Sequence, residues 1–263
     1  MRAVFQIAQN TYREWMRDRV FWVSSAFGGF FLFVSILGGS VDPFRADRVV
    51  ASWGYVSIRI CLLGLALLLG VGMVHREIER RTIQLMLSRR VSWSRFVFSK
   101  YIGLLALILV NGGIMVLGWA LSQKLLSPEG SLLGVLQVSV LVLAEAALLG
   151  AVAVFWSSIS RPPLAASLSA MSWIFGHQQS LLKQIHQQLQ VGDGSVSDVL
   201  LSLLLSLGQV FPRFELFVRE FEVNHFLILG WKNWGGTLIY GFVFSVSLVG
   251  LGGWMFQRRS SLQ

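Results

Sequence analysis

Long apolar runs dominate the pattern of this chain, and polar stretches separate each run from the next. At the scale of a roughly 19-residue window, the apolar segments lie at about 20–41, 49–74, 101–122, 132–156, 162–182 and 235–256. The segments 20–41 and 101–122 each hold 22 residues without a charge, and about 20 apolar residues are enough to cross the hydrocarbon core of a bilayer. The pattern therefore predicts an all-α, polytopic membrane protein with six transmembrane helices.

The composition supports one membrane domain rather than a soluble globule. Of the 263 residues, 54% are hydrophobic and 13% are charged, which is too apolar for a soluble protein of ordinary composition. No internal repeat and no low-complexity tract divides the chain, so residues 1–263 are expected to form a single transmembrane domain. The single cysteine, Cys61, excludes an intrachain disulfide and a multi-thiolate metal site.

The net charge of +9 fits two kinds of partner, a nucleic acid or the inner face of a membrane. With six spans and the N-terminus inside, 14 of the 22 basic residues fall on the inner side, 7 fall outside and Arg59 lies within a span. Lys and Arg accumulate in the cytoplasmic loops of membrane proteins. The distribution predicts that both termini are cytoplasmic, and it removes the support for a nucleic-acid partner.

Two polar segments are expected on the cytoplasmic side. The first, 1–19, carries a stripe at helical spacing, which predicts a helix that lies in the membrane interface and contacts lipid. The stripe consists of Val4, Ala8, Tyr12, Trp15 and Arg19. The second, 75–100, holds the densest cluster of charges in the chain. Within it, Ser92 is positioned to cap a short second helix that begins near Trp93.

The long segment 176–234, between the last two spans, is expected on the extracytoplasmic side. It opens with a glutamine-rich tract and contains the apolar stretch 199–210. Those 12 residues are too few to cross a bilayer as a helix. They predict a re-entrant or interfacial helix, which Pro212 should close.

The sequence motifs of several enzyme classes are absent. Gly-Lys never occurs, which excludes a phosphate-binding P-loop, and neither H-E-x-x-H nor G-x-S-x-G is present. The four histidines lack the close spacing of metal ligands. We therefore expect that the chain has no enzymatic activity, binds no cofactor and holds no metal.

Two charged residues lie inside predicted spans, where each costs roughly 2.5–3.5 kcal/mol on insertion scales. Arg59 lies 10 residues into the second span and Glu145 lies 13 residues into the fourth, so their depths differ by about 5 Å at about 1.5 Å per residue. The alternatives are a buried ion pair, a Glu145 that faces a substrate cavity, or an Arg59 that snorkels while Glu145 is protonated. Asn111, midway along the third span, is interpreted as a contact between helices rather than with a ligand.

The run from Glu77 to Arg95 reads EIERRTIQLMLSRRVSWSR, and Lys100 follows it. It resembles the cytoplasmic loop between the second and third spans of ABC-2 type permeases, with Arg81 where that family usually has Gly and Arg90 where it usually has Pro. The residues at 157–163 and 211–215 are similar to the branch that includes the permeases of nitrous-oxide-reductase maturation and of gliding motility.

This resemblance implies a half-transporter in a bacterial or archaeal cytoplasmic membrane. Two copies of the chain would form a homodimer, and each copy would dock on a separate cytoplasmic ABC ATPase that binds ATP and Mg. The loop 75–100 would act as the coupling helix of an ATP-driven exporter. The residues that the resemblance assigns to this ATPase contact are Glu77, Glu79, Arg80, Thr82, Ser88, Val91, Ser92 and Arg95.

A second class of function stays open at this point. The chain could instead be a membrane scaffold or signalling protein that transports nothing and binds an extracytoplasmic partner through 176–234. In the transporter interpretation, the first, second and fifth spans are the candidates for the seam between two copies. No cluster of Met, His or Cys marks a metal path, and the transported substrate is not indicated by any motif.

Overall fold

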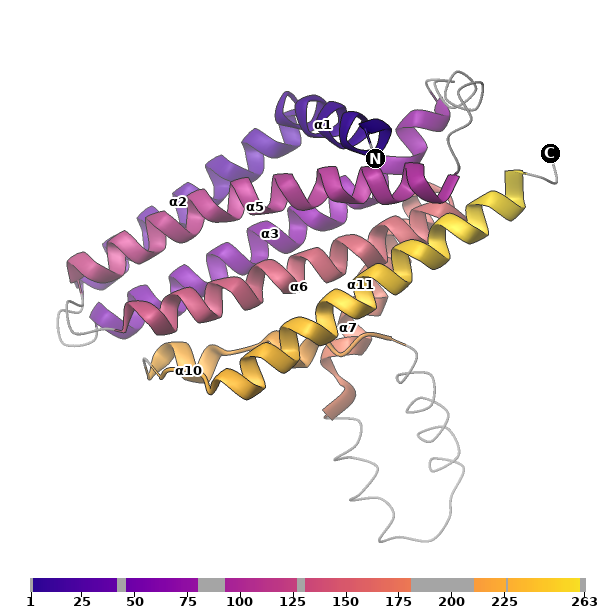
Figure 1. The fold of residues 1–263 in the computed structure, drawn as a ribbon. Helices are drawn as coiled ribbons and strands as arrows, with labels where there is room; N and C mark the ends of the chain where they lie inside the picture. The colour runs from indigo at the N-terminus through magenta and orange to yellow at the C-terminus, as the bar shows by residue number, and fades with distance from the viewer. Residues whose placement is uncertain are drawn as a thin grey trace, which may run out of the picture.

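The computed structural model describes residues 2–41, 46–79, 93–126, 131–180, 211–225 and 227–260, and every regular element in these ranges is helical. The elements are α1 (Arg2–Met16), α2 (Arg19–Val41), α3 (Ala46–Glu79), α5 (Trp93–Leu126), α6 (Leu132–Ile159), α7 (Pro162–His177), the 3₁₀ turn η1 (Phe214–Phe217), α10 (Glu220–Asn224) and α11 (Trp231–Ser260). The long helices pack side by side in one bundle (Figure 1). The all-α architecture expected from the sequence is confirmed.

Five of the described helices are long and apolar enough to cross a membrane. Their spanning portions are Arg19–Ser40, Asp47–Met73, Ser94–Leu125, Leu132–Ile159 and Trp231–Met255. These helices indicate a membrane protein. The six-span count is not confirmed, because the segment predicted at 162–182 contributes the 16-residue helix α7. At about 1.5 Å per residue such a helix is about 24 Å long, which is shorter than a hydrocarbon core of about 30 Å.

Helices α3 and α6 form the centre of the bundle. In their apolar windows, 61% and 72% of the residues are buried, whereas only 17% are buried in α2. Small residues allow this close packing: a Cβ added to Gly70 of α3 would lie 2.7 Å from the Cβ of Ala153 on α6. The bulky side chains of α2 and α11 therefore form much of the outer, apolar surface of the bundle.

The contacts along α6 fix the direction of its neighbours. Helix α11 runs parallel to α6, because Trp234 bonds to the carbonyl of Gln137 near one end and Gly252 lies against Phe155 near the other. In the chain between these two helices, α7 runs back along α6 in the opposite direction: it follows the end of α6, and Trp173 near its own end bonds to Glu145 at the middle of α6. The described residues that follow α7 continue this return, and the carbonyl of Leu227 lies close to Gly134 at the start of α6.

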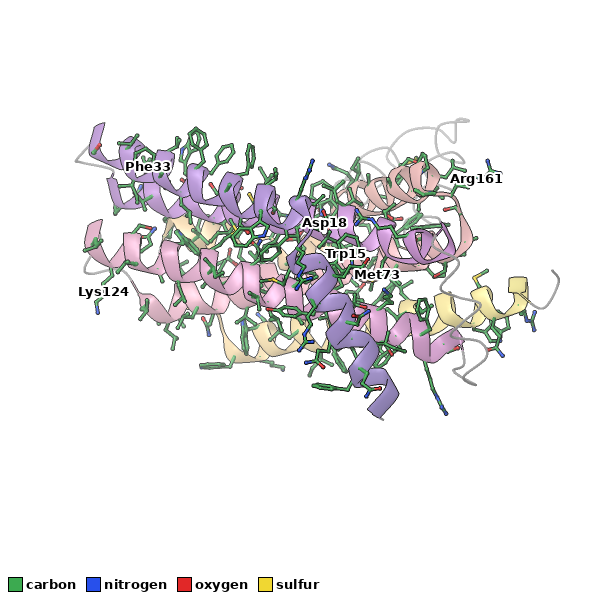
Figure 2. All side chains as sticks on the ribbon, turned by 90° about the horizontal axis from the view of Figure 1, so that it is seen from above. Trp15, Asp18, Phe33, Met73, Lys124 and Arg161 are labelled. Atoms are coloured by element: carbon green, nitrogen blue, oxygen red, sulfur yellow. The ribbon has the colours of Figure 1, made fainter. Side chains whose placement is uncertain are left out.

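Helix α1 crosses the long helices near the end of the bundle where both termini lie (Figures 1 and 2). It packs against α5, with Ala8, Thr11 and Trp15 buried, and Thr11 sits close to Gly103. Of the predicted stripe, Ala8 and Trp15 are buried within the protein rather than available to lipid, and the buried Thr11 was not part of that stripe. Arg19 does not belong to this helix, because a turn at residues 17–18 ends α1 and Arg19 begins α2.

The helix predicted to begin near Trp93 does begin there, but it is not short. It continues as α5 to Leu126, because its first turns bury Phe96 and Val97 in the core. The stretch 199–210 lies outside the described residues. The described part of 176–234 packs into the bundle, where Phe214 and Phe217 of η1 are fully buried.

Candidate functional site

A polar cluster lies at the centre of the bundle. Arg59 is at the middle of the apolar portion of α3, and Glu145 is at the middle of α6. The Nε and Nη2 atoms of Arg59 donate to the two carboxylate oxygens of Glu145, each at 2.8 Å. Such two-point contacts are the strongest form of an Arg–carboxylate interaction. The two charges that the sequence places at similar depth are paired in the structure.

The two partners differ in burial. The carboxylate of Glu145 is 0% exposed, whereas the side chain of Arg59 is 18% exposed. An ionised carboxylate in such a place costs several kcal/mol unless its partners compensate for the lost water. The hydrogen bonds from its neighbours must therefore compensate a buried Glu145 carboxylate for the water that it loses. Part of the Arg59 side chain stays accessible.

Helix α7 adds two side chains to the cluster. The indole of Trp173 donates to Oε1 of Glu145 at 3.3 Å, and Nε2 of His177 lies 2.5 Å from Nη2 of Arg59. Because a guanidinium can only donate, Nε2 of His177 must accept this bond. The Nδ1 atom then carries the ring proton and donates to the carbonyl of Trp173 at 3.2 Å. In this hydrogen-bond pattern His177 is neutral.

Backbone contacts beside the cluster hold α7 in place. Gly176 lies so close to the carbonyl of Pro212 and the ring of Phe214 that no Cβ fits there. Phe214 also stacks on His177, with ring centroids 5.9 Å apart and an angle of 10° between the planes. A further hydrogen bond, from the backbone N–H of Arg219 to the hydroxyl of Tyr55 at 3.2 Å, ties the same segment to α3.

A groove runs along the outside of the cluster between α3 and α7. It encloses about 440 Å³ and is lined by Val56, Arg59, Ile60, Leu63, Gly64, Leu67, Leu149, Ala170, Trp173 and Ile174. Arg59 is the only charged residue in this lining. The exposed side of its guanidinium thus meets an otherwise apolar cavity.

Asn111 does not belong to this cluster. Its amide nitrogen donates to Oγ of Ser25 at 2.7 Å, which joins α5 to α2. Its amide oxygen is buried and has no hydrogen-bond partner in the described part of the chain. The contact supports the interpretation of Asn111 as a link between helices.

A second set of charges lies where α1, α2 and α3 meet. Arg76, near the end of α3, donates to the carboxylate of Asp18 and lies over the ring of Trp15, with its Cζ 4.2 Å from the ring centroid. Burial alone would raise the pKa of Asp18, but the hydrogen bonds from Arg76 and from the Val20 N–H, together with the charge of Arg76, hold it below its usual value.

The residues assigned to the ATPase contact lie at the end of α3, at the start of α5 and in the loop that joins these two helices. Glu77 and Glu79 belong to the last turn of α3, and Arg95 is exposed in the first turn of α5. The remaining members lie outside the described residues: Arg80, Thr82, Ser88, Val91 and Ser92. Their proposed role stays a prediction.

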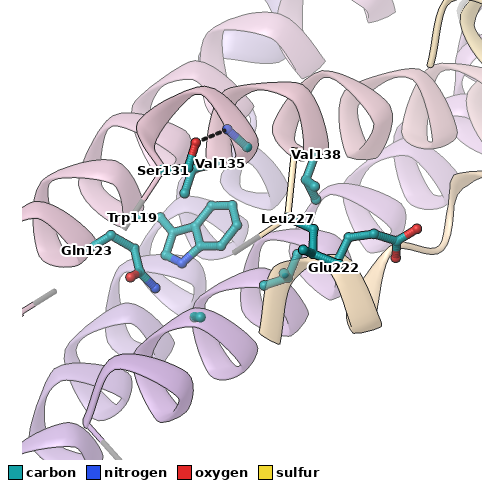
Figure 3. A pocket seen from close by; sticks show the side chains of 10 residues that line it. Trp119, Gln123, Ser131, Val135, Val138, Glu222 and Leu227 are labelled. Atoms are coloured by element: carbon teal, nitrogen blue, oxygen red, sulfur yellow. Dashed lines mark hydrogen bonds between the residues drawn. The ribbon is translucent and has the colours of Figure 1, made fainter. Parts of the chain in front are cut away.

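A smaller cavity lies at the opposite end of the bundle (Figure 3). It is lined by residues that include Trp119, Gln123, Ser131 and Leu227, and it offers about 10 Å³, which is about the space of one water molecule. It is too small for an organic ligand. Both amide atoms of Gln123 are buried without a hydrogen-bond partner among the described residues.

Sequence reasoning missed two members of the cluster, Trp173 and His177. Both lie in the predicted span 162–182, and His177 lies where that span overlaps the segment 176–234, but neither was weighed as a partner for the intramembrane charges. One local signal was available: Trp173 and His177 are four residues apart at the end of an apolar run, which places both on one helical face.

Comparison of the sequence with models of known protein families gives no match, and comparison with curated proteins gives none either. Among the residues that the structure describes, no group of three or more His, Cys, Asp or Glu side chains is arranged to hold a metal ion. Function must therefore be inferred from the cluster, the groove and the flanks of the loop 75–100.

Proposed function

We propose that this chain is the membrane-spanning subunit of an ATP-driven exporter whose ATPase is a separate cytoplasmic protein. The observation that carries the proposal is the continuity of α3, a single helix of 34 residues from Ala46 to Glu79. It holds Arg59 at the central cluster and leads directly into the loop 75–100. An ATPase docked on that loop would act on the cluster through a rigid element.

The contacts of α1 support this role for the loop. Arg76 of α3 pairs with Asp18 and covers Trp15, while Lys100 of α5 lies 3.9 Å from the carboxylate of Glu14. The two helices that flank the loop are thus both attached to the segment 14–18. A force on the loop would move this end of the bundle as a unit rather than bend one helix alone.

Nucleotide chemistry belongs to the partner in this proposal. The chain has no P-loop motif, so ATP and Mg would be bound by the ATPase subunit. The same reasoning assigns no catalytic residue and no cofactor to this chain.

The proposed topology has six crossings, of which the fifth is broken. Helices α6 and α11 run parallel, so the chain must return between them, and α7 together with residues 211–229 would make that return. Both termini lie at one end of the bundle (Figure 1), which the excess of Lys and Arg assigns to the cytoplasm. A broken helix at mid-depth is acceptable in a membrane where protein surrounds its end, as Phe214 and His177 do here.

We place a second copy of the chain against α2. This helix leaves a large apolar surface open, including Phe27, Phe30 and Phe33, which are about half exposed or more. Exporters built from half-transporter subunits need such a seam, and α2 was among the candidate helices. Single-cysteine variants along α2, made after replacement of Cys61, should give a crosslinked dimer in native membranes, and monomer alone would contradict this placement.

Docking of the ATPase on the loop 75–100 is tested by reversing two charges in that loop. The double variant Glu79→Lys/Arg80→Glu should lose association with the proposed ABC ATPase subunit, measured by co-purification from membranes. The matched control Arg161→Glu changes an exposed charge outside the loop and should keep the complex. Helix content and the unfolding midpoint of both variants show that the bundle is intact.

The outcome separates the two classes of function. Retention of the complex and of its ATPase activity in the double variant would refute the docking assignment. Failure of any ATPase to co-purify with the native chain would refute the exporter, and it would favour a scaffold that binds its partner through 176–234.

A further inference from the structure

The groove between α3 and α7 has the properties of a binding site for a molecule that enters from the bilayer. Nine of its ten lining residues are apolar or glycine, so an occupant must be apolar over most of its surface. Ile60 and Ile174 in its walls are 58% and 51% exposed, which leaves the groove open on the lipid-facing side. Because Arg59 lies at the middle of α3, the groove opens near the centre of the membrane.

One donor in this lining is not used by the protein. Arg59 spends Nε and Nη2 on Glu145 and His177, and its Nη1 has no hydrogen-bond partner among the described residues. The other side-chain donor in the wall, the indole of Trp173, is already bonded to Glu145. An occupant of the groove can therefore satisfy the guanidinium by presenting one acceptor atom.

The charges around Arg59 decide what kind of acceptor fits. Glu145 already neutralises the guanidinium, and His177 is neutral in the hydrogen-bond pattern of the cluster. A carboxylate or phosphate at Nη1 would stand close to the buried carboxylate of Glu145, and two like charges at such range repel strongly where water is excluded. An uncharged carbonyl oxygen accepts the same hydrogen bond without this repulsion.

We propose that the groove binds an uncharged, lipid-like molecule that carries a carbonyl oxygen, with the carbonyl on Nη1 of Arg59. A quinone and a glycerol ester share this chemistry. This assignment names a substrate class for the proposed exporter. It rests on the proposed function only in stating that the bound molecule is transported. Binding itself is measured on the chain alone, so failure of the exporter and failure of this site can be told apart.

The probe is a benzophenone that carries a long alkyl chain, because it is uncharged, has a carbonyl and links to nearby C–H bonds under ultraviolet light. The full chain in lipid nanodiscs is labelled, and the labelled peptides are identified by mass spectrometry. Labels should concentrate on the parts of α3 and α7 that line the groove. Labels spread over α2 and α11 in proportion to their lipid-exposed surface would overturn the proposal.

Competition tests the chemistry of the ligand. A long-chain ketone should prevent labelling at a roughly tenfold or more lower concentration than an alkane of equal length, as one hydrogen bond to a charged group implies. A fatty acid of equal length, in its ionised form, should compete no better than the alkane. If the alkane competes as well as the ketone, Arg59 has no role in binding. If the fatty acid competes better than the ketone, the groove is an anion site instead. A decyl quinone and a diacylglycerol, used as further competitors, distinguish the two sources of the carbonyl.

Two glycine variants provide a matched pair. A Cβ on Gly64 or on Gly113 would meet no atom within 4 Å, so both helices should tolerate Leu. Gly64 lines the groove, whereas Gly113 lies on α5 outside its lining. We expect Gly64→Leu to lower labelling of the groove at least about tenfold and Gly113→Leu to leave it unchanged. Equal labelling of both variants would refute the site. An unlabelled groove in the native chain, with a second copy of the chain seated in it, would also refute the site.

Discussion

Removal of either partner of the central ion pair should destabilise the bundle, and removal of both should restore much of the loss. The variants are Arg59→Leu, Glu145→Gln and the double variant Arg59→Leu/Glu145→Leu, with Glu145→Leu as the matching single change for the cycle. Breaking a buried pair typically costs about 3–5 kcal/mol, whereas replacing it by apolar groups is often neutral. The double change should therefore cost much less than either single change.

The structure also predicts which single change is more harmful. Arg59→Leu strands the carboxylate of Glu145, which is 0% exposed in the native structure, with Trp173 and His177 as its remaining polar neighbours among the described residues. Glu145→Gln leaves a guanidinium that is 18% exposed and still bonded to His177. Arg59→Leu should therefore cost at least about 1 kcal/mol more than Glu145→Gln, because the stranded charge is more completely desolvated.

The measurement is the free energy of unfolding in mixed detergent micelles that allow reversible unfolding. A coupling energy of about 2 kcal/mol or more between positions 59 and 145 is expected, within the range of contacting charged residues. The control cycle pairs Asn111→Leu with Ser25→Ala, which breaks one neutral hydrogen bond between α5 and α2. Bonds of that kind in membranes average about 0.6 kcal/mol, so the control coupling should be clearly smaller.

Additive losses in the Arg59/Glu145 cycle would refute the structural pair. Retained stability of Glu145→Gln combined with loss of transport in the assembled exporter would instead place Glu145 on the substrate path. The alkyl-benzophenone label provides an independent readout, since the single change at Glu145 leaves the lining of the groove intact.

Three further changes test other parts of the structure. Gly176→Ala should lower the free energy of unfolding by about 1–3 kcal/mol, because its methyl group would collide with a neighbouring backbone carbonyl; Gly235→Ala, with open space around it, should be neutral or stabilising. Gln123→Met should stabilise by about 1 kcal/mol, because it removes two buried polar atoms that have no partner among the described residues. Asp18→Asn should cost less than about 1 kcal/mol near pH 7, since Arg76 is partly exposed. Because the pKa of folded Asp18 is lowered, the difference in unfolding free energy between the native chain and Asp18→Asn should be present above about pH 4 and vanish as the pH falls through that pKa. Unfolding curves at a series of pH values measure it.

Most of the correct predictions came from two properties of the sequence, namely the lengths of its apolar runs and the positions of charged residues within them. The five long helices follow from apolar runs that the membrane itself requires. Counting residues along two antiparallel helices placed Arg59 and Glu145 at similar depth and made their pairing one of three alternatives, which the structure then selects. Helix ends were less predictable. Hydropathy stops near Tyr101 for α5, whereas packing of Phe96 and Val97 extends the helix back to Trp93.

The partners of the cluster were beyond the sequence because they meet through the fold. Phe214 stacks on His177 across a gap of 37 residues in the chain, and no periodicity connects the two positions. A hydropathy window over 162–182 registers only apolar content, so it predicts a full span. It cannot register that Gly176 leaves room for the carbonyl of Pro212, which lets the following segment pack against the end of α7.

In the proposed topology, where α7 ends inside the bilayer, that end gives a physical reason for charge at this depth. A helix that stops inside a bilayer leaves carbonyl groups without partners and a partial negative charge at its last turn. Here the ring of His177 donates to the carbonyl of Trp173, the N–H of Gln178 donates to those of Ile174 and Phe175, and the guanidinium of Arg59 contacts the ring of His177. Glu145 then balances Arg59. The ion pair and the end of α7 share these bonds, so in the proposed exporter a transition that moved α7 along α3 would have to break or exchange them.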